Sequence, residues 1–204
     1  MSNPAGILLA AGMSSRFGSD KLLYELTIDG EYRPLIHHTL LSWFSLFDEL
    51  TVVIRADTPQ LRQTVLDLAS TQHKKINLIE CQNAALGMGH SLSAAIKANL
   101  LASGWIIGLA DMPLIPDAVL NQVYQHVKSG VLITAPYFDG QRGHPVGFNR
   151  QYKDELLALE GDSGAKKLLQ RDVEKIQKID TDHQGVLMDI DCKQDVSRIE
   201  KAAD

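Results

Sequence analysis

The sequence predicts an α/β fold of three layers, in which helices cover both faces of a mostly parallel sheet. Short apolar segments rich in Val and Ile recur along the chain, and most lack the polar alternation of a sheet with one solvated face. These segments lie at residues 6–10, 50–55, 76–80, 105–110 and 131–135. Helical patterns separate them, and this alternation of strands and helices indicates right-handed βαβ units.

Three segments between these strands carry apolar residues at the spacing of one helix face. In chain order the three sets are Ile36, Leu40, Trp43, Phe44 and Phe47; Leu92, Ala95, Ile96 and Leu100; and Val119, Val123 and Val127. Pro116 precedes the third set, where proline suits the first turn of a helix. We therefore expect a helix in each segment.

After residue 135 the pattern changes, and shorter elements are expected. In order they are a polar, glycine-rich passage at 137–147, a helix-like run from Arg150, a helix ending near Gln170, strands at 173–179 and 186–190, and a closing helix opened by Asp191. No linker or internal repeat divides the chain. Because 204 residues suffice for one substantial core, we expect a single domain over residues 1–204.

Composition excludes several classes of protein. The 20 basic and 25 acidic residues give a net charge of −5, whereas a protein that holds nucleic acid usually carries a basic patch. Cys81 and Cys192 lack metal-ligand spacing, and two free thiols suit a reducing compartment. The apolar run Ile7–Ala11 is too short for a signal peptide or a membrane span. We expect a cytoplasmic protein with neither nucleic acid nor a membrane as partner.

A run of small residues follows the first strand. It reads Leu9-Ala10-Ala11-Gly12-Met13-Ser14-Ser15-Arg16-Phe17-Gly18, and Lys21 follows shortly after. Such a loop lets backbone N–H groups converge on an anion, and a nearby cation neutralises the charge. The spacing is that of neither the G-x-G-x-x-G dinucleotide motif nor the P-loop. The residues alone leave two interpretations open: a triphosphate site, or a tight turn with Arg16 and Lys21 in solvent.

Carboxylates follow two of the expected strands. Asp111 comes directly after the strand at 105–110, at the sheet edge where wound folds bind ligands, and Mg²⁺ prefers one or two such oxygens. Asp111 could equally open the turn before the next helix. Asp189 and Asp191 follow the last expected strand. Asp191 could be a second metal ligand or the N-cap of the final helix, and the sequence does not say which of the two faces a metal.

The loop motif L-A-A-G-x-S-x-R-x-G-x-x-K, complete here from Leu9 to Lys21, resembles the opening signature of the MobA-like NTP transferases, closest to their molybdenum cofactor cytidylyltransferase branch. Asp111-Met112-Pro113 is similar to the family's L-x-D-M-P element. The resemblance implies a Rossmann-like nucleotidyltransferase fold and Mg²⁺ as cofactor. It assigns Asp111 and Asp191 to the metal, Arg16 to the β- and γ-phosphates and Lys21 to the α-phosphate. The other loop residues expected at the nucleotide are Leu9, Ala10, Ala11, Gly12, Ser14 and Ser15.

Three further motifs resemble family elements. Gly87 and Ser91 match G-x-x-x-S-L, which implies contact with the base or ribose, although the residues alone also fit a simple helix start. Arg142-Gly143-His144-Pro145 matches the R-G-H-P element of molybdopterin cytidylyltransferase relatives and implies an acceptor site. There a glycine lets the backbone approach a flat ring. Asp162, within G-D-x-G-A, is expected on the same wall or as a helix cap.

The expected reaction transfers CMP from CTP to the phosphate of molybdopterin, the organic part of the molybdenum cofactor, with release of pyrophosphate. The resemblance favours CTP because Ala11 stands where guanylyl-transferring relatives more often have Gly. GTP as donor, or a sugar or alcohol phosphate as acceptor, remains an alternative with the same chemistry. An alternative of another class is a non-catalytic carrier of the finished cofactor. A client molybdoenzyme is a further candidate partner.

Overall fold

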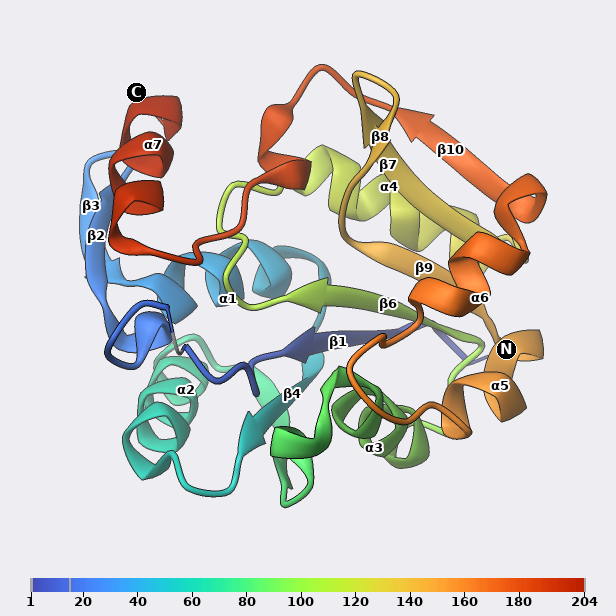
Figure 1. Ribbon diagram of the computed structural model, residues 1–204, viewed down its shortest axis with the longest axis horizontal. Helices are drawn as coiled ribbons and strands as arrows, with labels where there is room; N and C mark the ends of the chain where they lie inside the picture. Colours follow the sequence, from blue (N-terminus) through green and yellow to red (C-terminus); the bar gives the residue numbers. More distant parts are fainter. Residues whose placement is uncertain (1, 15, 204) are drawn as a thin grey trace.

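The computed structural model describes residues 2–14 and 16–203, built around a sheet of eight strands (Figure 1). The strands are β1 (Ala5–Leu9), β4 (Glu49–Arg55), β5 (Lys75–Cys81), β6 (Gly104–Leu109), β7 (Ile133–Phe138), β8 (Gln141–Arg142), β9 (Val146–Asn149) and β10 (Ile176–Asp180). Their order is β10-β7-β9-β6-β1-β4-β5, and β8 pairs with β7. A separate hairpin consists of β2 (Glu25–Ile28) and β3 (Glu31–Pro34).

The sheet is mostly parallel, which confirms the predicted fold class. β1 runs parallel to β4 and β6, β4 to β5, and β7 to β10. Only β9, between β6 and β7, and the short β8 run antiparallel to their neighbours. β9 begins inside the polar, glycine-rich passage at 137–147, where no strand was predicted. Gly147 hides the strand signal there, since a Cβ at this position would lie 2.4 Å from Val127 of the helix beneath.

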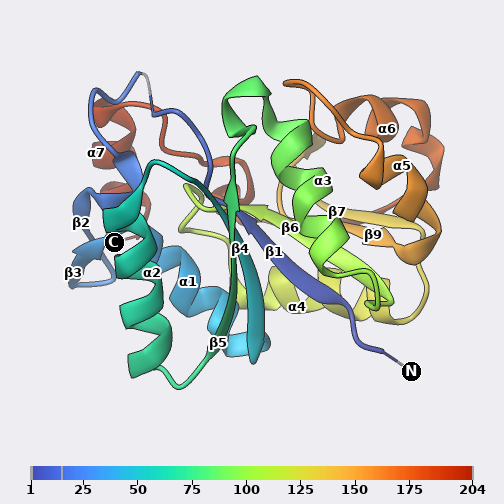
Figure 2. The ribbon, with the colours of Figure 1, turned by 90° about the horizontal axis from the view of Figure 1, so that it is seen from below.

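Helices cover both faces of the sheet and complete the three layers (Figure 2). On one face lie α1 (Leu35–Leu46), α2 (Pro59–Thr71) and α4 (Asp117–Lys128); on the other lie α3 (Met88–Ala98), α5 (Lys153–Leu157) and α6 (Lys166–Arg171). α7 (Lys193–Ala203) packs beside the β2–β3 hairpin. Each face has its own apolar core, with Trp43 fully buried in one and Trp105 in the other.

Helix ends differ from the predicted patterns at two residues. α1 ends at Leu46, so Phe47 lies beyond it, where the ring remains buried and stacks on Trp43 with centroids 5.6 Å apart. α3 ends at Ala98, and the prediction that Leu100 belongs to its buried face is wrong, since Leu100 is 40% exposed. Asn99 is the C-cap residue of α3, and its side-chain amide donates a hydrogen bond of 2.8 Å to the carbonyl of Ala95.

Of the two late strands, one is shorter than predicted and the other does not form. β10 begins only at Ile176, because residues Val173–Lys175 form a 3-10 turn. The predicted strand at 186–190 is wrong: a 3-10 helix spans Gln184–Leu187. Gly185 explains this path, since a Cβ on it would lie 2.0 Å from the carbonyl oxygen of Leu114, so the chain is pressed too closely against its neighbour to join the sheet.

The connections around β1 and β6 place a crevice at the carboxyl ends of these two strands. β1 leads to β4 through α1 on one face, whereas β5 reaches β6 through α3 on the other face. The strand order reverses at β1, because β4 and β5 lie on one side of it and β6 lies on the other. The carboxyl edge at such a reversal is where wound sheets bind ligands.

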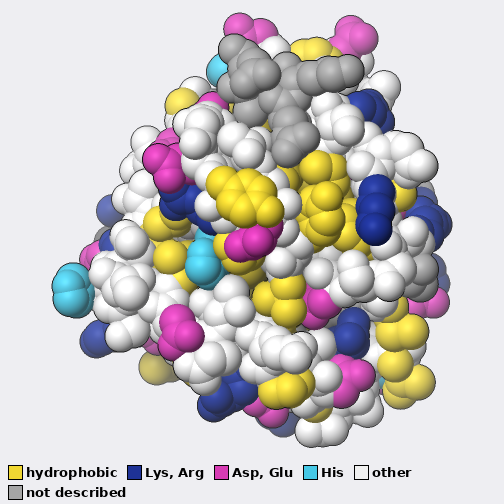
Figure 3. All heavy atoms as spheres, turned by 90° about the vertical axis from the view of Figure 1, so that its left-hand side faces the viewer, with side chains coloured by type: hydrophobic (Ala, Val, Ile, Leu, Met, Phe, Trp, Pro, Cys, Tyr) yellow, Lys and Arg dark blue, Asp and Glu magenta, His cyan; other side chains and the backbone are white. Residues whose placement is uncertain are grey.

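The surface that carries α7 and the hairpin is mixed in character. Figure 3 shows acidic, basic and hydrophobic side chains interspersed on this face. None of the described helices has the length and hydropathy that crossing a membrane requires.

Candidate active site

A cavity of about 430 Å³ occupies the crevice at the ends of β1 and β6. Its walls come from the loop after β1, the start of α3, the end of β6 and the segment before α7. Residues expected at the nucleotide or the metal line it, namely Leu9, Ala10, Ala11, Gly12, Ser14, Arg16, Lys21, Gly87, Ser91, Asp111 and Asp191. Ser15 lies outside the described residues. The fold thus brings together motifs that are up to 182 residues apart, from Leu9 to Asp191.

Lys21 lies in the floor of this cavity and is 7% exposed. It begins a 3-10 turn, Lys21–Leu23, that Asp20 caps by accepting a hydrogen bond from the Leu22 amide. The Lys21 Nζ donates to Asp111 Oδ2 and to the Ile190 carbonyl, each at 2.6 Å, and to Asp191 Oδ1 at 3.3 Å. Burial alone would lower the pKa of Lys21, but the two carboxylates outweigh it and raise the pKa. The side chain is therefore a charged ammonium group at neutral pH.

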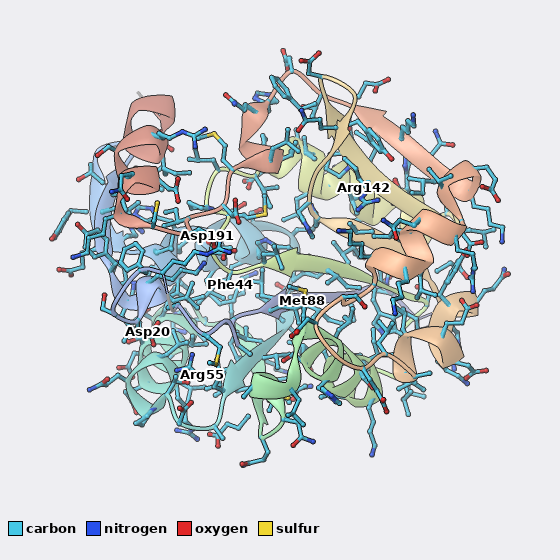
Figure 4. The ribbon with its side chains drawn as sticks, in the orientation of Figure 1. Asp20, Phe44, Arg55, Met88, Arg142 and Asp191 are labelled. Atoms are coloured by element: carbon cyan, nitrogen blue, oxygen red, sulfur yellow. The ribbon has the colours of Figure 1, made fainter. Side chains whose placement is uncertain are left out.

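Three carboxylates surround that ammonium. Asp111, Asp189 and Asp191 each bring one oxygen within 4.8 Å of the others (Figure 4 labels Asp191). Burial, followed by repulsion from Asp111 and Asp191, raises the pKa of Asp189. The Oδ1 atom of Asp111 is shielded from solvent and accepts no hydrogen bond from any described residue. A hard divalent cation such as Mg²⁺ prefers such oxygens, so these residues fit a metal.

The side chain of Asp191 faces the cavity. Its carboxylate accepts hydrogen bonds from Lys21 and, at 2.8 Å, from Arg16 Nη1. The capping role at the start of α7 belongs to Asp195, whose Oδ2 accepts from the amides of Asp191 and Cys192 at 3.0 and 2.8 Å. Two alternatives were left open for Asp191, a second metal ligand and the N-cap of the final helix. These contacts favour the first.

The loop after β1 presents backbone amides without partners. The N–H groups of Ala11, Gly12, Met13 and Ser14 donate to no residue in the described part of the chain. Ser14 has a positive φ of 49°, which bends the loop into a concave turn. Concave turns of successive free amides bind anions, and many phosphate sites are built in this way. Arg16, with a side chain 78% exposed, supplies a cation at the rim.

The opposite wall pairs the start of α3 with the segment before α6. Gly87 has φ 120°, and a Cβ there would lie 2.2 Å from the Gly161 carbonyl carbon. Gly89 donates a hydrogen bond to the Gly161 carbonyl at 2.8 Å. This contact places Asp162 at the cavity beside the buried Ser91. Asp162 therefore shares the wall of Gly87 and Ser91, the residues expected at the base or ribose.

Arg142, Gly143, His144 and Pro145 are not among the residues that line the cavity. Arg142 ends β8, and the residues after it pack against the 3-10 helix at Gln184–Leu187. The backbone N–H of His144 donates to the Val186 carbonyl, and a Cβ on Gly143 would lie 2.4 Å from that oxygen. The close approach of Val186 therefore already requires a glycine at position 143, without any bound acceptor. Burial and then Arg142 lower the pKa of His144 to about 4, against smaller opposing effects of a hydrogen bond with the Ile107 backbone and of Asp189. That acceptor binding occurs here remains a prediction.

A sequence profile of the MobA-like NTP transferase domain matches residues 6–176. The chain belongs to the MobA-like NTP transferase family. A curated relative, the purine catabolism protein PucB of Bacillus subtilis strain 168, is 30% identical over 202 residues, covering 97% of this chain and 96% of PucB. Family membership makes the chain a nucleotidyltransferase whose substrates include an NTP.

Solved structures share the fold of this NTP transferase over nearly its whole length. Rv0371c of Mycobacterium tuberculosis H37Rv has a TM-score of 0.79 at 24% identity, with 98% of each chain covered. A second structure of Rv0371c, in complex with manganese, has a TM-score of 0.75 at 23% identity, covering 98% of this chain and 99% of Rv0371c. Molybdopterin-guanine dinucleotide biosynthesis protein A from Archaeoglobus fulgidus has a TM-score of 0.65 at 19% identity, with 97% of each chain covered.

Some residues of the transferase site escaped the sequence motifs. Met13, Ala84, Ala85 and Met88 line the cavity, and Met13 and Met88 are 63% and 45% exposed at its mouth. In the sequence, Met13 and Met88 each stand next to a glycine of a motif, but nothing there shows that their side chains are exposed.

Proposed function

We propose that this chain catalyses Mg²⁺-dependent transfer of CMP from CTP to the phosphate of molybdopterin, forming molybdopterin cytosine dinucleotide and pyrophosphate. The observation that carries the proposal is one cavity in which unpartnered loop amides lie opposite Lys21 and three carboxylates. Nucleotidyl transfer needs little covalent help from a protein and much electrostatic positioning. The cavity supplies donors for phosphate oxygens and acceptors for a metal within the same space.

The residues of this chain would act as follows. The amides of the loop and the exposed Arg16 bind the β- and γ-phosphates of the nucleotide. Lys21 exchanges its carboxylate partners for the α-phosphate, where negative charge builds up in the transition state. Asp111, Asp189 and Asp191 would hold Mg²⁺, which supplies charge neutralisation at the phosphates when bound. No protein nucleophile or base is needed, because the acceptor phosphate is ionised at neutral pH.

CTP as donor rests on Ala11. This residue lines the cavity, and its methyl group narrows the space that a glycine would leave to the larger purine ring. One methyl group discriminates by roughly 10- to 200-fold in a close-fitting pocket. GTP remains the alternative donor.

Molybdopterin as acceptor rests on the Arg142–Pro145 segment, which resembles the R-G-H-P element. Arg142 is partly exposed and is seen in the same view as Met88 and Asp191 of the cavity (Figure 4). There it can meet a phosphate or a pterin edge. Sugar and alcohol phosphates are the alternative acceptors. Because PucB is named for purine catabolism, a molybdoenzyme that acts on purines is the client to test first.

The deciding experiment incubates the purified protein with Mg²⁺, molybdenum cofactor and either CTP or GTP, and measures both pyrophosphate and the dinucleotide. Turnover with CTP alone supports the proposal, and turnover with GTP alone reassigns the donor. Nucleotide binding without turnover of molybdopterin rejects this acceptor, and sugar and alcohol phosphates are then tested. Tight binding of the finished dinucleotide with no turnover of any acceptor would favour a carrier.

A further inference from the structure

Arg55 reaches the phosphate loop from outside the cavity. It is the last residue of β4, the strand that pairs with β1, and its Nη1 donates a hydrogen bond of 2.8 Å to the Gly12 carbonyl (Figure 4). The Nε of Arg55 donates to Asp57 Oδ1 at 2.9 Å, which orients the guanidinium group, and the side chain is only 22% exposed. Arg55 does not line the cavity itself. Its contact with the site therefore runs through the loop backbone.

Holding the Gly12 carbonyl also fixes the next amide. In a planar trans peptide the C=O and the N–H point in opposite directions, so the Met13 N–H points away from Arg55. Met13 lines the cavity, and its amide donates to no residue of the described chain. The hydrogen bond from Arg55 thus turns this amide toward the space where phosphates would bind.

The loop needs such a restraint because Gly12 provides none. A Cβ at Gly12 would contact nothing within 4 Å, so neither packing nor a side chain limits rotation of the Gly12–Met13 peptide. A rotated peptide would present a carbonyl oxygen instead of an amide and repel an anion. A hydrogen bond from a charged guanidinium group is among the stronger restraints a side chain can apply.

We propose that Arg55 is a positioning residue for the triphosphate: it binds the Gly12 carbonyl and so keeps the Met13 amide directed at the phosphates of the nucleotide. This inference rests on the proposed nucleotide site but not on the identity of base or acceptor. The proposal predicts a loss of phosphate affinity, not of base recognition, when Arg55 is replaced.

The test compares Arg55→Gln with the matched control Arg62→Gln by calorimetry, using inorganic tripolyphosphate, CTP and GTP as probes. Arg62 pairs with Glu80 on the surface of α2, so its replacement removes the same charge without touching the loop. We expect Arg55→Gln to weaken the binding of tripolyphosphate and of the nucleotide by the same factor, about tenfold or more. Arg62→Gln should change either affinity by less than about twofold. Arg55→Lys, which keeps a charged donor, should recover part of the affinity.

Unchanged tripolyphosphate affinity in a folded Arg55→Gln protein would overturn the inference. So would a loss of nucleotide affinity that spares tripolyphosphate, because it would place the effect at the base. If Arg55→Gln does not fold, Arg55→Lys decides alone: affinity lower than wild type by a common factor for both probes supports the proposal, and wild-type affinity refutes it. A wild-type protein that binds neither tripolyphosphate nor nucleotide would refute the proposed function itself.

Discussion

The ammonium group of Lys21 lies 2.6 Å from Asp111 Oδ2, among the three carboxylates that would hold a metal. Without a cation, these carboxylates repel one another, and Lys21 is the buried positive charge that offsets them. The contact therefore has two consequences. Lys21 stabilises the metal-free protein, and it competes with a divalent cation for the same oxygens.

Replacement of Lys21 by methionine should sharply reduce turnover and at the same time tighten metal binding. We expect turnover to fall about 10²- to 10³-fold, as for the loss of one preorganised charge at a transition state. The free energy of unfolding of the metal-free protein should fall by about 1–3 kcal/mol, because the Asp111 carboxylate loses a partner while 18% exposed. Manganese titration followed by electron paramagnetic resonance should show a lower dissociation constant than wild type.

The matched control is Lys74→Met. Lys74 pairs with the fully exposed Asp48 at 2.8 Å. It directly precedes β5, at the sheet edge opposite the cavity, and such surface pairs contribute little to stability. Turnover, manganese affinity and stability should stay close to wild type. Weaker manganese binding in Lys21→Met would show that Lys21 organises the carboxylates instead of competing for them.

His144 should make stability depend on pH. Burial, then Arg142, lower the pKa of His144 to about 4 from 6.5. Between about pH 6.5 and 4 the unfolded chain binds a proton at His144 and the folded chain does not. The neutral ring therefore contributes stability above about pH 6.5, and this contribution is lost as the pH falls toward 4. The loss should reach about 2 kcal/mol after allowance for partial exposure.

Denaturant unfolding of wild type and His144→Gln at a series of pH values measures this contribution. Other groups titrate in both proteins, so only the difference between the two curves reports on His144. That difference should shrink by about 2 kcal/mol between pH 6.5 and 4. A difference that stays constant over this range would mean that the pKa of His144 is the same in the folded and the unfolded protein.

The cavity wall at Gly87 should be intolerant of any side chain. Gly87→Ala adds a Cβ 2.2 Å from the Gly161 carbonyl carbon at a φ of 120°, so both backbone strain and overlap oppose it. We expect a cost of about 3 kcal/mol in the free energy of unfolding. Gly130→Ala is the control, because φ there is 97° but no atom lies within 4 Å. Its cost should be about 1–2 kcal/mol, and equal costs would show that Gly161 moves aside freely.

Strand-end motifs were predictable from the sequence because their signal lies in side chains. Apolar runs predicted β1, β4, β5, β6 and β7, and the small residues after β1 and the carboxylate Asp111 after β6 reach the cavity. Features set by backbone contacts were not predictable. Gly147 conceals β9 because it packs against Val127, and Gly185 diverts an apolar stretch from the sheet. The Ile190 carbonyl on Lys21 and the Gly12 carbonyl on Arg55 carry no signal in side-chain type.

Ala11→Gly should relax the choice of nucleotide. If the Ala11 methyl group limits the space beside the base, its removal leaves room for a purine and little changes for a pyrimidine. We expect the ratio of kcat/KM for CTP to that for GTP to fall about tenfold or more, mainly because the value for GTP rises. Steady-state pyrophosphate release with each nucleotide measures the ratio, and Ala85→Gly, at another lining position, is the control. An equal fall for both nucleotides would mean that the methyl group supports the phosphate loop and leaves selectivity to other residues.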